Sequence, residues 1–101
     1  MRNKNTYSLQ PAFELVRKIK YSNEHVADWG PSYFVEAKND AVKQMWSDLE
    51  VLTKQHVNAN EPFKMSFDGG DSPTASFTWY DTHGGSNTIT WHIEKRTNIV
   101  V

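Results

Sequence analysis

Two residue pairs in the C-terminal part of this 101-residue chain have the types and spacing that acid–base chemistry requires. Asp81 and His83 are two residues apart, and so are His92 and Glu94. Residues two apart in a strand point to the same side, so each carboxylate could orient its imidazole as a general base or join it as a metal ligand. Neither pair has an identifiable nucleophile, third ligand or substrate pocket. We therefore interpret the first pair as a solvated hairpin tip and the second as part of a cross-strand polar ladder.

A small enzyme that uses His83 or His92 remains a hypothesis, but we assign no catalytic residue. A third stretch, Asp68-Gly69-Gly70-Asp71-Ser72, superficially resembles an acidic metal loop or a phosphate-binding loop. It lacks the run of oxygen ligands ending in glutamate that a calcium loop needs, and it lacks the lysine of a phosphate loop. We interpret it as a hairpin turn with two exposed carboxylates. No metal site and no cofactor are expected.

The chain has no cysteine, which excludes disulfides, cysteine-ligated zinc and thiol nucleophiles. A zinc deaminase is excluded too, since its His-x-Glu pair works with a Pro-Cys-x-x-Cys segment. The N-terminal residues contain no apolar run of signal-peptide length, and no stretch approaches the length of a membrane span. We expect one domain over residues 1–101, in the cytoplasm.

Charge is distributed unevenly, although the net charge is only −1. Residues 1–20, which include Arg2 and Lys4, have a net charge of +4, whereas residues 21–94 have a net charge of −7. A chain polarised in this way can present faces of opposite sign to its partners.

Apolar residues near the start recur at helical spacing. The stripe consists of Leu9, Ala12, Phe13, Val16 and Ile19. Pro11 suits a first helical turn, where a backbone N–H is not needed. The pattern predicts a helix from Leu9 to Tyr21.

Residues 22–31 are typical of a loop and end in the breaker Gly30-Pro31. Residues 32–57 allow two interpretations. Residues 32–38 form a short strand that precedes a helix, or one long helix begins at Ser32. We favour the strand, and a helix from about Asp40 to Val57 is common to both.

The last forty residues alternate apolar and polar side chains with period two over three segments joined by glycine-containing turns. They predict an antiparallel meander with an apolar face and a polar face. The apolar set is Phe63, Met65, Phe67, Ala75, Phe77, Trp79, Ile89, Trp91 and Ile93. The polar set is Lys64, Ser66, Asp68, Ser76, Thr78, Tyr80, Thr88, Thr90, His92 and Glu94. The expected fold class is α+β, an antiparallel three- to four-stranded sheet with two helices packed on one face.

Clustered carboxylates and aromatic residues favour a binding function. We interpret the chain as a small non-catalytic protein-binding module, such as an inhibitor, immunity protein or phage-encoded antagonist, that binds a basic protein. The expected contact residues lie in loops, in turns or on the polar face: Asp28, Trp29, Asp68, Asp71, Tyr80, Asp81 and His83. Trp29 has a second interpretation, in which its ring closes one end of the core.

The alternative is a single-stranded nucleic-acid-binding domain that uses the sheet face and the basic N-terminal helix. Tyr80 and His92 would stack bases, with Lys64 nearby. The acidic middle of the chain opposes this alternative, because it would repel a phosphate backbone.

Overall fold

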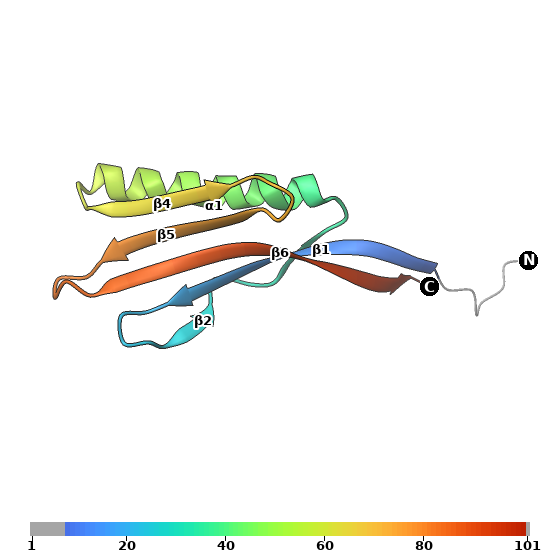
Figure 1. Cartoon of the computed structure of the whole chain (residues 1–101), viewed down its shortest axis with the longest axis horizontal. Coiled ribbons are helices and arrows are strands. Elements are labelled where there is room, and N and C mark those ends of the chain that lie inside the picture. The colour runs from blue at the N-terminus through green and yellow to red at the C-terminus, as the bar shows by residue number, and fades with distance from the viewer. Residues whose placement is uncertain (1–7, 101) are drawn as a thin grey trace, which may run out of the picture.

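The computed structural model describes the backbone of residues 8–100 and the side chains of residues 12–96, which form one helix and six strands (Figure 1). In chain order these elements are β1 (Ser8–Lys20), β2 (Val26–Asp28), β3 (Tyr33–Val35), α1 (Lys38–Asn58), β4 (Phe63–Asp68), β5 (Thr74–Tyr80) and β6 (Ser86–Val100).

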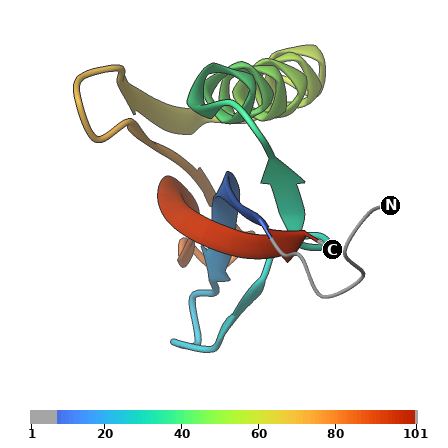
Figure 2. The same ribbon diagram turned by 90° about the vertical axis from the view of Figure 1, so that its right-hand side faces the viewer.

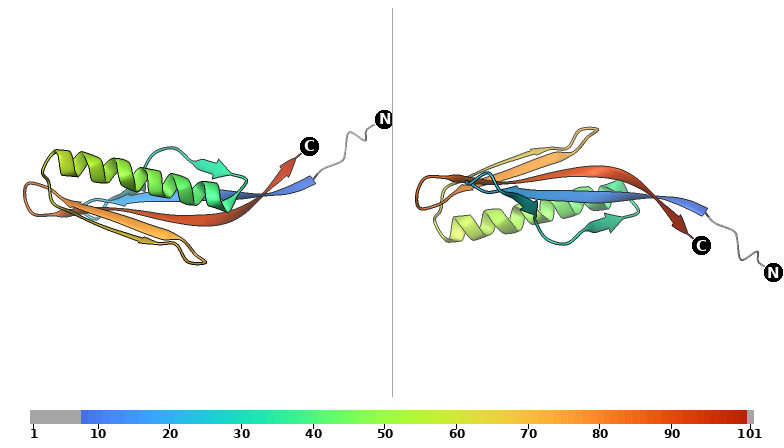
Figure 3. Two further views of the ribbon diagram at one scale, coloured as in Figure 1. Left: turned by 90° about the horizontal axis from the view of Figure 1, so that it is seen from above. Right: turned by 90° about the horizontal axis from the view of Figure 1, so that it is seen from below.

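All strands belong to one antiparallel sheet with the order β2-β1-β6-β5-β4, and β3 pairs with β1 beside β2. The first and last strands are therefore neighbours in the middle of the sheet. α1 lies along one face of the sheet and leaves the opposite face uncovered (Figures 2 and 3). The molecule is thus two layers deep, with the core between helix and sheet.

The expectation of two helices on a three- to four-stranded sheet is wrong, because the described residues form one helix and six strands. The segment expected to form the N-terminal helix is β1, which pairs with β6 over its whole length. Leu15 and Ile19 alternate toward the core as a strand requires, but Arg17 stands at the inward position between them. This charged residue conceals the period of two, and the remaining apolar residues then fit a helical period.

The expectations for the rest of the chain are confirmed more closely. Residues 32–57 form a strand and then a helix, as favoured, and α1 begins two residues before Asp40. The C-terminal segments form the expected meander of β4, β5 and β6. The segment expected to be a loop before Gly30 also contains β2.

The core confirms the expected direction of the pleat. Its largest fully buried side chains come from β1, α1, β5 and β6: Trp91, Phe77, Leu15, Met45, Leu49 and Ile89. Trp79 is half-buried and packs against this core. Met65 and Phe67 of β4 belong to the expected apolar face but remain partly exposed near the edge of the sheet.

β1 and β6 extend beyond the other strands as a two-stranded ribbon (Figure 1). The pairing with β5 ends at His92 and the pairing with β3 ends at Phe13, so Ser8–Ala12 pairs with Arg96–Val100 alone among the described residues. Arg2 and Lys4, part of the basic N-terminal segment, lie outside the described residues. Within residues 8–100, no helix combines the length and apolar character needed to cross a membrane.

Candidate functional site

The uncovered face of the sheet, here called the open face, carries the even-numbered side chains of its strands. Residues opposite each other in an antiparallel pair share a face, so the register assigns the members. They are Glu14, Val16, Lys18, Lys20, Val26, Asp28, Phe34, Lys64, Ser66, Asp68, Thr74, Ser76, Thr78, Tyr80, Ser86, Thr88, Thr90, His92 and Glu94. The polar face expected from the sequence is therefore confirmed, and β1 and β2 widen it.

Hydroxyl groups pair with one another across the centre of the open face. Ser66 Oγ lies 2.7 Å from Ser76 Oγ, and Thr78 Oγ1 lies 2.9 Å from Thr88 Oγ1. Thr90 stands opposite Ser76 in the next strand. These bonds fix the rotamers of short side chains, which gives the centre of the face an ordered, uncharged surface.

Ion pairs flank this neutral centre. Lys18 donates a hydrogen bond to Asp28, which stands opposite it in β2, and this bond together with the aspartate's negative charge raises the pKa of Lys18. Arg96 bonds to both Glu14 (3.0 Å) and Glu94 (2.8 Å). Exposed pairs of this kind contribute little to stability, but they neutralise the charges of Lys18 and Arg96.

The two candidate acid–base pairs are engaged elsewhere. Asp81 Oδ1 accepts hydrogen bonds from the backbone N–H groups of His83 (2.9 Å) and Gly85 (2.8 Å), and its Oδ2 accepts one from the Ser22 hydroxyl (3.0 Å). The bonds from Gly85 and then Ser22 are the main reasons that the pKa of Asp81 is lowered. The carboxylate thus fixes the β5–β6 turn and receives no described bond from the imidazole ring.

His92 is also weakly placed for catalysis, since its Nε2 lies 3.9 Å from Glu94 Oε2 while Arg96 holds that same oxygen at 2.8 Å. His92 stands opposite Thr74 in β5, in line with the expected polar ladder. Among the residues that the structure describes, no group of three or more His, Asp or Glu side chains is placed to hold a metal ion.

A buried polar cluster that sequence reasoning missed joins the helix to the sheet. Asp48 Oδ2 accepts hydrogen bonds from Trp91 Nε1 (3.0 Å) and Arg17 Nη1 (3.2 Å), and its Oδ1 accepts one from Gln44 Nε2 (2.8 Å). Arg17 Nη2 donates to the carbonyl of Pro31 at 3.0 Å. Both carboxylate oxygens are satisfied from inside the molecule, which is typical of a structural carboxylate.

Trp29 and Tyr33 enclose the arginine of this cluster. The guanidinium carbon of Arg17 lies 5.6 Å from the centre of each ring, and the ring of Trp29 meets that of Trp91 edge-on at 5.7 Å. Trp29 therefore closes one end of the core, which was the second interpretation of this residue. A signal for the cluster was present in the sequence, because Asp48 follows Ala41 by seven residues on the apolar stripe of the helix.

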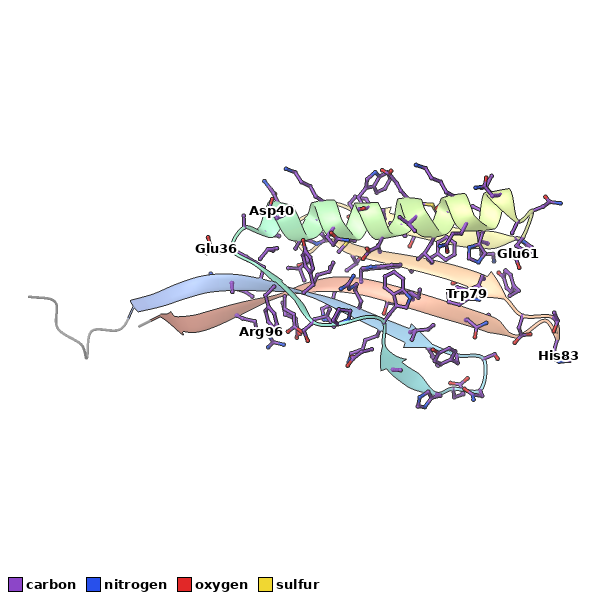
Figure 4. All side chains as sticks on the ribbon, turned by 180° about the vertical axis from the view of Figure 1, so that it is seen from behind. Glu36, Asp40, Glu61, Trp79, His83 and Arg96 are labelled. Atoms are coloured by element: carbon purple, nitrogen blue, oxygen red, sulfur yellow. The ribbon has the colours of Figure 1, made fainter. Side chains whose placement is uncertain are left out.

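The structure does not gather the seven expected contact residues into one patch. Asp28, Asp68 and Tyr80 share the open face, and Asp71 lies beside it in the β4–β5 turn. Asp81 and His83 lie in the turn at the opposite end of β5, and Figure 4 shows His83 at its tip. Trp29 belongs to the core side.

Four acids lie around the start of α1 and the β4–β5 turn and define what is here called the acidic end: Glu36, Asp40, Asp68 and Asp71. Lys38 and Lys95 line a hollow there together with Asp71. The two parts are linked because Lys38 Nζ donates a hydrogen bond to the carbonyl oxygen of Asp71. Figure 4 shows Glu36 and Asp40 together at the start of the helix, with their side chains directed away from the core. Sequence reasoning named Asp68 and Asp71 but not Glu36, which precedes α1, or Asp40 in its first turn.

Several hollows lie near the rim of the sheet and have volumes of about 170, 210 and 240 Å³. A larger apolar groove of about 440 Å³ lies between α1 and β4.

Comparison with known proteins identified no matching family model, no matching curated protein and no matching solved structure. The function must therefore be argued from the surfaces themselves.

Proposed function

We propose that the protein is a small non-catalytic module that binds another protein, one with a basic surface, through the open face and the acidic end. The observation that supports this most directly is the polar centre of the open face, where ordered hydroxyl pairs are flanked by ion pairs. An inhibitor, immunity protein or phage-encoded antagonist would act in this way.

A broad, polar sheet face suits a protein better than a small molecule. Small-molecule sites are concave and mostly apolar, usually of about 300 to 1,000 Å³. The open face spans five strands, and β5 is seven residues long. At typical strand spacings it measures about 19 by 23 Å, on the order of 450 Å², a sizeable part of the roughly 800 Å² that each partner contributes to a stable complex.

The charge balance favours a basic partner. Residues 12–96 contain nine lysine and arginine residues and twelve acids, so this part of the chain has a net charge of −3 with histidine neutral. Several cations of the sheet are already paired with carboxylates, whereas Asp68 at the end of β4 and Asp71 in the turn that follows are exposed. Complementary charge would accelerate encounter with a cationic surface.

The nucleic-acid alternative loses part of its basis. The basic helix on which it depended is the strand β1, and Lys18 and Lys20 of that strand pair with Asp28 and Glu24. Lys64 and Tyr80 remain on the open face, but the pairing of the other lysines leaves less positive charge for a phosphate backbone.

Substitution of Thr90 by arginine tests the proposal, because it places a bulky cation at the centre of the open face. The full chain would be mixed with candidate basic effectors, such as nucleases, and complexes detected by native mass spectrometry. We expect Thr90→Arg to weaken a stoichiometric complex roughly tenfold or more, as the loss of central contacts does at other interfaces. Gln55→Arg, on the exposed side of α1, is the matched control and should bind normally.

Two outcomes would count against this proposal. Equal binding by Thr90→Arg and wild type would move the contact to another surface. Binding of a single-stranded oligonucleotide at low salt, with no protein complex formed, would favour the nucleic-acid alternative.

A further inference from the structure

β4 is an edge strand with one side unpaired. It is last in the strand order and bonds to β5 on its other side, and no second described strand adjoins it. An edge of this kind presents a row of backbone N–H and C=O groups that another strand can join. Proteins often protect such an edge with a charged side chain, and β4 carries Lys64.

Partly exposed apolar side chains lie beside this edge, on the helix side of the sheet. Trp46 of α1 is 43% exposed, Met65 is 40% exposed and Phe67 is 37% exposed. The rings of Trp46 and Phe67 meet edge-on at 5.1 Å, and Met65 with Trp46 lines the apolar groove of about 440 Å³. Adjacent large side chains left this exposed are typical of a surface that another molecule covers.

We propose that β4 pairs with β4 of a second copy of this chain, antiparallel and related by a twofold axis at Ser66. In this register Lys64 stands opposite Asp68 of the second copy, and Asp68 stands opposite its Lys64. Met65 stands opposite Phe67 in the same reciprocal way. The sequence Phe63-Lys64-Met65-Ser66-Phe67-Asp68 is thus complementary to itself, as a twofold interface requires.

Neighbouring registers lack this complementarity. A shift by one residue would bring the polar side chains of one copy onto the helix side of the other. A shift by two residues places either Lys64 or Asp68 opposite Ser66 and loses both ion pairs. The lysine that would otherwise discourage edge pairing therefore selects one register and one partner.

The arrangement keeps both α1 helices on the same side of one continuous sheet, because the axis is perpendicular to the sheet. Trp46, Met65 and Phe67 of both copies would then meet at the junction. The apolar contacts lie on the helix side, whereas the Lys64–Asp68 pairs lie at the margin of the open faces. The inference goes beyond the proposed function and does not depend on it.

Two charge-reversal variants test the pairing. Lys64→Asp places acids opposite acids in a pair of identical copies, and Asp68→Lys places lysines opposite lysines. By sedimentation equilibrium on the full chain, we expect a concentration-dependent wild-type dimer and a dissociation constant roughly tenfold or more higher for each variant alone. An equimolar mixture should restore the dimer, because each of the two cross-strand contacts then joins an acid of one variant to a lysine of the other.

Circular dichroism would establish that each variant is folded. Asp68→Asn is a further variant that removes the charge of Asp68 but keeps the oxygen that accepts a hydrogen bond from Gly70 N–H in the turn. A wild-type chain that stays monomeric up to millimolar concentration would overturn the inference. So would a dimer that both charge reversals leave unchanged, since it would then form through another surface.

Discussion

At the scale of single residues, Asp48 joins three parts of the molecule. It binds Trp91 of the sheet, Gln44 of its own helix and Arg17, which in turn binds the carbonyl of Pro31. Burial of charge is costly, so this carboxylate depends on having all its partners in place. The same property explains why sequence reasoning missed it, since a charged residue on an apolar stripe is more often placed in solvent.

Removal of this carboxylate should be severe. We expect Asp48→Ala to lower the free energy of unfolding by about 3 to 5 kcal/mol, because Arg17 would be left buried without its counter-charge. Urea denaturation followed by circular dichroism measures the change. Glu50→Ala, on the exposed side of α1, should stay within about 0.5 kcal/mol. Similar losses in the two variants would contradict a structural role for Asp48.

Asp81 gives a pH-dependent contribution to stability. Its pKa is lowered in the folded protein, so the ionised form stabilises the fold above the ordinary aspartate pKa of about 3.9, and this contribution is lost as the pH falls below that value. We expect Asp81→Asn to have a lower melting temperature than wild type at pH 7 and to lose less stability between pH 5 and pH 2.5. Thermal unfolding across this pH range measures both differences. An Asp81→Asn variant that loses as much stability as wild type between pH 5 and pH 2.5 would refute this role.

At the scale of elements, the sequence carried enough information for α1, β4, β5 and β6, because their apolar residues keep a single period. β1 could not be predicted because its inward positions include Arg17, and only the tertiary partners Asp48, Trp29 and Tyr33 make that position favourable. β2 and β3 have three residues each, too few to show a period. For the candidate site, the polar face was predictable from alternation, but the ion pairs across it depend on the unforeseen strand β1.

The pleat of β5 can be tested directly. Phe77 is fully buried and stacks with Phe63 at 5.2 Å, whereas Tyr80 of the same strand is 36% exposed. We expect Phe77→Ala to reduce the free energy of unfolding by about 3 to 5 kcal/mol. Tyr80→Ala should cost about 1 kcal/mol or less. Equal costs, measured by chemical denaturation, would mean that the two faces of β5 are not distinguished in this way.

At the scale of the whole molecule, the two proposed surfaces reinforce each other. Pairing through β4 would place two open faces side by side on one side of a continuous sheet. Their joint area, about 900 Å² at typical strand spacings, reaches the roughly 800 Å² that one partner contributes to a stable complex. A dimer could therefore bind one extended basic protein more firmly than a single copy could.

The central position of β1 and β6 has a consequence for biosynthesis. Thirteen residue pairs connect these strands, from Ser8 with Val100 to Lys20 with Thr88. Every one of them spans most of the chain, so a nascent polypeptide on the ribosome has no middle strand pair until β6 emerges from the exit tunnel. Such distant pairing slows folding, and during that interval the backbone edge of β5 that later pairs with β6 has no partner strand.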